Sequence, residues 1–155
     1  MNRLIAISVL LLNFTCLFGQ SEIEQRKIGK ESFIKISNAT IIKLFNLSFE
    51  DWESLIVQLG YTKMDDSEGN ITYSKGEIGG QIQAISKDKI GLLSIDWFDF
   101  IDKIRLTQEI EKSLQPYFVK KDNGISYYNF EDYIIGIKVY EDNNYLNESV
   151  YIRRK

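Results

Sequence analysis

The residue types that most metal sites and nucleophilic enzymes use are scarce in this chain. Among its 155 residues there is no histidine and one cysteine, Cys16. Zinc, copper and haem sites depend on Cys and His ligands, and Ser-His-Asp and Cys-His catalysis both need a histidine base. The sequence therefore excludes these two catalytic systems and predicts neither a cofactor nor a metal site. Carboxylate, lysine or tyrosine chemistry stays open, as does cation binding through oxygen.

Two groups of carboxylates could support such chemistry. The segment 65–70 is acidic, but it lacks the alternating spacing and the bidentate glutamate of a calcium loop, so we interpret it as a solvated turn. Asp96, Asp99 and Asp102 straddle the end of an expected strand and the start of an expected helix. Helix capping accounts for Asp99 and Asp102 without catalysis. We predict a protein that is not an enzyme; a small carboxylate-dependent hydrolase is the alternative.

Tyrosine is concentrated in the C-terminal half, which holds seven of the nine. On a strand a tyrosine either covers the sheet or forms a recognition surface, because it brings a large contact area and one polar tip at low entropic cost. Both interpretations stay open. The recognition hypothesis assigns binding to aromatic residues of the expected strands: Trp97, Tyr127, Tyr128, Tyr133 and Tyr140.

The charge balance bears on the kind of partner. Lysine and arginine total 19 and acidic residues total 22, which gives a net charge of −3. Nucleic acid binding is not expected, because it needs a concentrated basic stripe. We expect a protein partner first, through the sheet face or the hairpin ends. A glycan-binding module is the second interpretation.

The first twenty residues are typical of a secretory signal peptide. Arg3 supplies the positive start, the run 4–18 is mostly apolar, and Gly19 is a small residue at which a peptidase could cut. The run is short for a membrane span, which needs about 20 apolar residues. We expect an exported protein, periplasmic or extracellular, without a stable membrane anchor after cleavage. An uncleaved anchor or a lipoprotein modified on Cys16 is the alternative.

The remaining chain is long enough for one domain, over 32–155, after a charged, flexible lead over 21–31. A short helix is expected over 40–46. A second helix is expected between Ser48, a suitable N-cap, and Gly60, a suitable residue just beyond the C-terminus.

Strands follow this helix as two hairpins, and the pattern then repeats. Helical spacing over 100–115 changes face near Leu106, and Pro116 ends that segment. When the chain is displaced by about 55 residues, its turns and alternating apolar positions coincide, with Tyr73 on Tyr128 and Gly69 on Gly124. We therefore predict an α+β fold. It consists of duplicated units of one helix and four strands, over about 48–97 and 103–153, that form an antiparallel sheet with the helices on one face.

This organisation resembles the tandem-repeat beta-lactamase-inhibitor-like and PepSY-like domains of bacterial envelopes. The resemblance covers 48–153 and concerns the order of elements; no family motif is matched residue by residue. The disulfides typical of the inhibitor proteins are absent here. The resemblance implies a non-enzymatic periplasmic module that binds another protein, and no site residue is transferred from it.

Overall fold

The fold was obtained as a computed structural model, which describes residues 23–28, 30–67, 70–76, 80–87, 89–99, 105–142 and 145–155. The predicted signal peptide, 1–20, lies outside these ranges. The described helices are α2 (Asn38–Asn46), α3 (Phe49–Gln58), α4 (Gln108–Leu114) and the short 3-10 helix η1 (Gln115–Tyr117). The first strands are β1 (Gln25–Ile28), β2 (Glu31–Ile34), β3 (Thr62–Ser67), β4 (Asn70–Lys75) and β5 (Gly80–Lys87). The others are β6 (Lys89–Asp99), β7 (Phe118–Asp122), β8 (Ile125–Phe130), β9 (Tyr133–Asp142) and β10 (Tyr145–Arg154).

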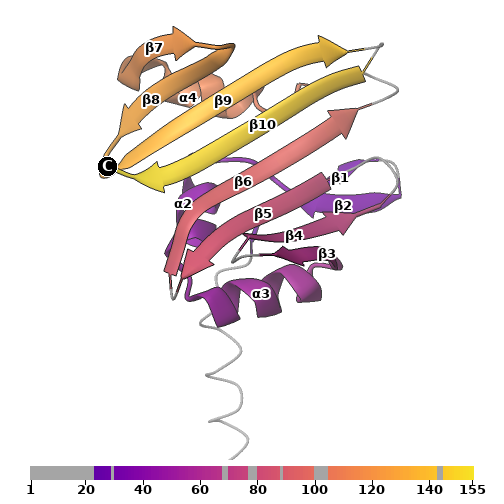
Figure 1. The fold of residues 1–155 in the computed structure, drawn as a ribbon. Helices are drawn as coiled ribbons and strands as arrows, with labels where there is room; N and C mark the ends of the chain where they lie inside the picture. Colours follow the sequence, from indigo (N-terminus) through magenta and orange to yellow (C-terminus); the bar gives the residue numbers. More distant parts are fainter. Residues whose placement is uncertain are drawn as a thin grey trace, which may run out of the picture.

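Strands β3 to β10 form one antiparallel sheet of eight strands in the order β3-β4-β5-β6-β10-β9-β8-β7 (Figure 1). Each half is a four-strand meander, and the two last strands, β6 and β10, pair at the centre. The first half follows α3 and the second follows α4. The predicted α+β fold of duplicated units is therefore confirmed.

The duplication extends to the register of the outer hairpin in each unit. Lys63 pairs with Tyr73 in the first unit, and Phe118 pairs with Tyr128 at the positions 55 residues later. Both edge strands contain a β-bulge directly after that pair, between Lys63 and Asp65 and again between Phe118 and Lys120. The repeat in the sequence thus reflects equivalent backbone geometry, including its irregularity.

The described helices pack on one face of the sheet. Trp52 of α3 contacts Tyr73, and Phe45 of α2 contacts Tyr133, both with edge-on rings. The chain just before α4 bonds to Glu148 through the Thr107 backbone. The strand register places Tyr73, Tyr133 and Glu148 on the same side of the sheet. We call this side the covered face and the opposite side the open face.

The helix boundaries follow from local chemistry. Ser48 accepts a hydrogen bond from the Asp51 backbone N–H, as an N-cap residue does. Gly60 follows α3 with φ of +85°, a conformation that favours glycine. In the second unit the chain bends at Leu106 and Thr107, and α4 begins at Gln108. Part of the expected helical segment, 100–104, lies outside the described residues.

The predicted flexible lead over 21–31 was partly wrong. Residues 25–28 form β1, which pairs with β2 in a separate two-stranded sheet. Gln25 and Lys27 are exposed and Arg26 is half-buried, so this strand is polar, and the run is too short to reveal a period. Ile23, Phe33 and Ile34 are buried in the core.

Candidate recognition surface

A single row of residues crosses the open face of the second unit. Lys120 pairs with Tyr127, Tyr127 with Gly136, and Gly136 with Tyr151. Tyr151 then pairs with Ser94 of the first unit. Because paired residues in an antiparallel sheet project to the same face, these side chains lie beside one another on the open face.

Two of the predicted binding residues belong to the core instead. Tyr128 is 4% exposed and Tyr133 is 7% exposed, and both lie on the covered face. The Tyr128 ring meets Phe118 edge-on at 5.8 Å between centroids. Their assignment to a recognition surface is corrected, because alternation along each strand turns them toward the helices.

Tyr133 has a specific structural role. Its hydroxyl oxygen accepts a hydrogen bond from Asn46 Nδ2 at 2.8 Å, and the side-chain oxygen of Asn46 accepts one from Arg154 at 2.7 Å. The Arg154 guanidinium lies over the rings of Phe45 and Tyr133, at 5.7 and 5.6 Å from their centroids. These contacts hold the end of α2 against the last strand.

Trp97 lies on β6, where its backbone pairs with Gly80 and Glu148. Its side chain is outside the described part of the structure, so the prediction for Trp97 stays a prediction.

The other two predicted residues lie on the open face with two that the sequence did not single out. Tyr140 is 42% exposed, and Tyr127 is half-buried. Lys138 and Tyr151 share their face, and the Lys138 ammonium lies 4.7 Å from the Tyr140 ring centroid. We call Tyr127, Lys138, Tyr140 and Tyr151 the tyrosine patch.

Gly136 allows two of these rings to approach each other across β9. A Cβ built on Gly136 would lie 3.5 Å from Tyr151 Cδ2, 3.6 Å from Tyr127 Cε1 and 3.2 Å from Ile125 Cγ2. The space that a larger side chain would occupy is thus lined by Tyr127 and Tyr151. Glycine in a strand often marks such a close approach.

The first unit differs at the matching part of the row. There the paired residues continue through Ser94, Gln83, Thr72 and Asp65. The row therefore changes from polar and acidic in the first unit to aromatic and basic in the second. The pairs Asp65–Thr72 and Lys120–Tyr127 occupy equivalent positions of the duplicated outer hairpins, so there the difference is one of side-chain chemistry.

Tyr151 and Lys138 could have been found from the sequence. Val150 and Ile152 flank Tyr151, and Ile137 and Val139 flank Lys138. Because the flanking apolar positions form the core, the intervening residues must project to the other face. Which face is left open depends on the helices, which the alternation does not report.

On the covered face, a buried carboxylate joins α4 to the sheet. Glu148 is 2% exposed, and its Oε2 accepts a hydrogen bond from the Thr107 backbone N–H at 2.7 Å. Its Oε1 accepts one from Arg105 Nε at 3.3 Å, and Arg105 also pairs with Glu111 at 2.6 Å. Burial raises the pKa of Glu148, and the hydrogen bonds from Thr107 and the charge of Arg105 oppose the rise.

This shift predicts a pH dependence of stability. A raised pKa means that the folded protein binds the proton more tightly than the unfolded chain, so the contribution to the free energy of unfolding falls as pH rises above 4.5, the ordinary value, through the raised pKa. Urea unfolding of the natural protein and of Glu148→Gln across this window should show a loss of stability with pH in the natural protein that the variant lacks. Parallel pH profiles would contradict this assignment.

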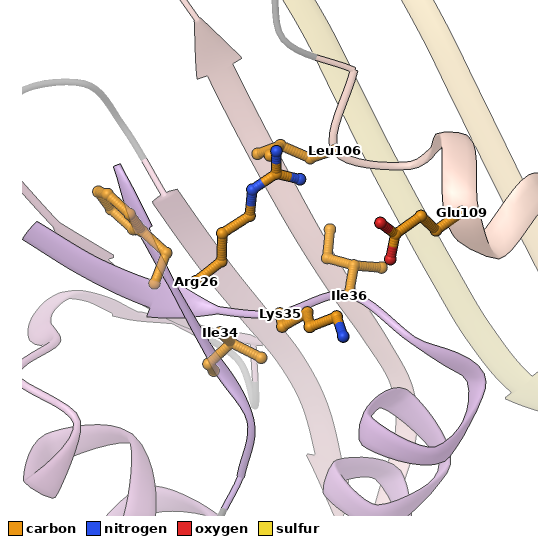
Figure 2. A pocket seen from close by; sticks show the side chains of 7 residues that line it. Arg26, Ile34, Lys35, Ile36, Leu106 and Glu109 are labelled. Carbon is orange, nitrogen blue, oxygen red and sulfur yellow. The ribbon is translucent and has the colours of Figure 1, made fainter. Parts of the chain in front are cut away.

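A small pocket lies between the β1–β2 hairpin and the start of α4 (Figure 2). Its empty volume is about 270 Å³, part of it open solvent. Arg26, Lys35 and Glu109 supply its charged groups, and Lys35 pairs with Glu24 at 3.0 Å. Because that volume includes open solvent, the enclosed space lies well below the usual range of small-molecule sites, about 300–1,000 Å³. The pocket also lacks the carboxylate pair that the hydrolase interpretation needs.

Within the described ranges, no cluster of three or more potential metal-ligating side chains was found. No described helix has the length and apolar character needed to cross a membrane. Comparison of the chain with protein-family models, with curated proteins and with solved structures found no match.

Proposed function

We propose that this protein is an exported, non-enzymatic binding module that recognises a protein partner through the tyrosine patch. The observation that carries the proposal is the gathering of Tyr127, Tyr140 and Tyr151 on the face opposite the described helices. Tyrosines are frequent at the energetic centre of protein interfaces. Export is supported by the sequence of the first twenty residues, with periplasmic or extracellular localisation.

The lysines favour a protein over a glycan. Lys138 lies over Tyr140, and the Lys120 ammonium lies 5.7 Å from the Tyr127 ring centroid. A sugar stacks on a free ring face, whereas these faces carry an ammonium group. A protein surface can meet both the ring edges and the cations, with carboxylates placed against the lysines.

The decisive test is capture of a partner by patch variants. A tagged protein that begins at Ser21 should retain one stoichiometric partner from envelope extract of the native host. The double variant Tyr127→Ala/Tyr140→Ala should lower the affinity for that partner by at least about 30-fold, as expected when two interface anchors are removed. The double variant should keep the natural circular dichroism spectrum, since neither ring is in the core.

Thr72→Ala is the matched control, because Thr72 occupies the position in β4 that Tyr127 occupies in β8. It should leave binding unchanged. Equal capture by the double variant would overturn the patch as the binding site. A bait that retains no protein but binds an oligosaccharide would favour the glycan interpretation.

A further inference from the structure

The exposed edge of the second unit carries an unusual run of apolar residues. Tyr117, Phe118 and Val119 are consecutive, and each is 42% to 52% exposed. Phe118 and Val119 begin β7, an edge strand of the sheet, and Tyr117 directly precedes them; no described strand pairs with the outer side of β7. Soluble proteins rarely leave a contiguous apolar group exposed without a binding role.

The equivalent positions of the first unit carry one exposed apolar residue, Met64, where the second unit carries three. Fifty-five residues earlier stand Thr62, Lys63 and Met64. The Lys63 ammonium forms ion pairs with Asp66 at 2.5 Å and with Glu53 at 3.5 Å. Two carboxylates therefore neutralise the positive charge at this edge. The second unit has phenylalanine in place of this lysine. Duplicated geometry with different chemistry indicates that the β7 edge serves a purpose that the β3 edge does not.

The apolar residues are held in place before any partner arrives. The Tyr117 ring meets Phe130 edge-on with centroids 4.8 Å apart, and the Phe118 ring meets Tyr128 at 5.8 Å. Tyr128 is itself buried in the core. Binding to this edge would therefore lose little side-chain conformational entropy. A small surface needs this low entropic cost to bind with useful affinity.

Charge decides which occupant fits. Lys120 and Lys121 follow the apolar run, and Lys120 pairs with Asp122 at 3.2 Å. Antiparallel pairing of two β7 edges in a register centred on Lys120 and Lys121 would place lysines against lysines, which disfavours that symmetric dimer. Pairing with β3 of a second copy would join two bulged strands and continue head to tail without closing. An extended segment that carries carboxylates and small apolar side chains meets neither obstacle.

We propose that the β7 edge is a second docking surface, which accepts an extended acidic segment of another protein as an added antiparallel strand. The segment's backbone pairs with the regular part of β7 beyond the bulge. On the open face its carboxylates meet Lys120, which pairs with Tyr127, and on the covered face its apolar side chains pack on Tyr117 and Phe118. This surface goes beyond the tyrosine patch: the two share Lys120, which lies over the Tyr127 ring, but the exposed apolar run at the β7 edge is a separate observation.

A designed peptide tests the proposal directly. The probe is a capped peptide that alternates glutamate with valine; its counterparts alternate lysine with valine or carry a central proline that blocks strand pairing. The glutamate peptide should slow amide hydrogen exchange in 118–122, and its affinity should fall as salt is raised. The lysine and proline peptides should bind at least about 10-fold more weakly, because they lose the charge match or the strand pairing.

The variant Tyr117→Thr/Phe118→Lys transfers the first unit's residues to the second and should weaken glutamate-peptide binding at least about 10-fold. Val119→Lys serves if that variant does not fold. Met64→Ala, on the other edge, and Tyr140→Ala, in the tyrosine patch, should leave peptide binding unchanged. Equal binding of the lysine peptide, unprotected β7 amides or no binding would overturn the proposal. So would self-association that the double variant abolishes, since a second copy would then occupy the edge.

Discussion

Replacing Trp52 by alanine should lower the free energy of unfolding by about 3–5 kcal/mol, the range for deleting a large aromatic from a core. Trp52 is fully buried where α3 meets the sheet. Its ring lies 5.7 Å from that of Tyr73 and 5.8 Å from that of Phe49. The variant would leave a cavity that the rigid sheet cannot close. Urea unfolding measures the loss. It should be followed by far-ultraviolet circular dichroism, because the backbone signal does not rely on the tryptophan that is replaced.

Trp52→Phe separates the packing effect from the polar atom of the indole. Trp52 Nε1 is buried without a hydrogen-bond partner, so phenylalanine removes an unsatisfied donor together with part of the ring. The loss should be well below that of Trp52→Ala. Equal losses in the two variants would show that the indole nitrogen, or a contact specific to it, contributes more than the packing does.

Glu148→Ala should have the second largest effect, about 2–4 kcal/mol, because it leaves the buried Thr107 N–H without an acceptor and removes packed atoms. Arg105 loses one of its two carboxylate partners and keeps Glu111. Since the Glu148 bonds join β10 to the residues before α4, loss of this carboxylate should loosen α4 before the rest of the domain. Hydrogen exchange should therefore accelerate first in 108–114.

Glu148→Gln is the control for that prediction. Its amide oxygen can still accept from Thr107, so the loss should be smaller than with alanine at neutral pH. If the alanine variant were as stable as the natural protein, the Glu148 bonds would not contribute to the position of α4.

The two variants report on different halves of the duplicated fold. The first unit is held to its helix by an aromatic contact, Trp52 on Tyr73, whereas the second uses a buried carboxylate at the start of α4. The tyrosine patch and the β7 edge both lie in the second unit. Loosening α4 should therefore weaken binding more than an equal loss of stability in the first unit.

Local pattern determined the architecture of this protein. Ser48 and Gly60 bound α3 as their capping chemistry requires, and Asn123 and Gly124, both with positive φ, form the turn between β7 and β8. The displacement of 55 residues predicted two equivalent meanders because turns and alternating apolar positions are local properties, and these fixed the α+β class. The strand at 25–28 escaped prediction, since four residues are too few to show a period.

The tertiary structure decided which tyrosines face the core. Alternation showed that Tyr127 and Tyr128 project to opposite faces, but it could not show which face the helices cover. Tyr133 looked like a surface residue until its partners on α2 and at Arg154 were visible, 87 residues away in one case. The exposed run at Tyr117 is likewise a consequence of strand order, because β7 is an edge only when the sheet is complete. The alternation of side chains along a strand can be read from the sequence. The exposure of each side chain depends on which distant elements pack against its face of the strand.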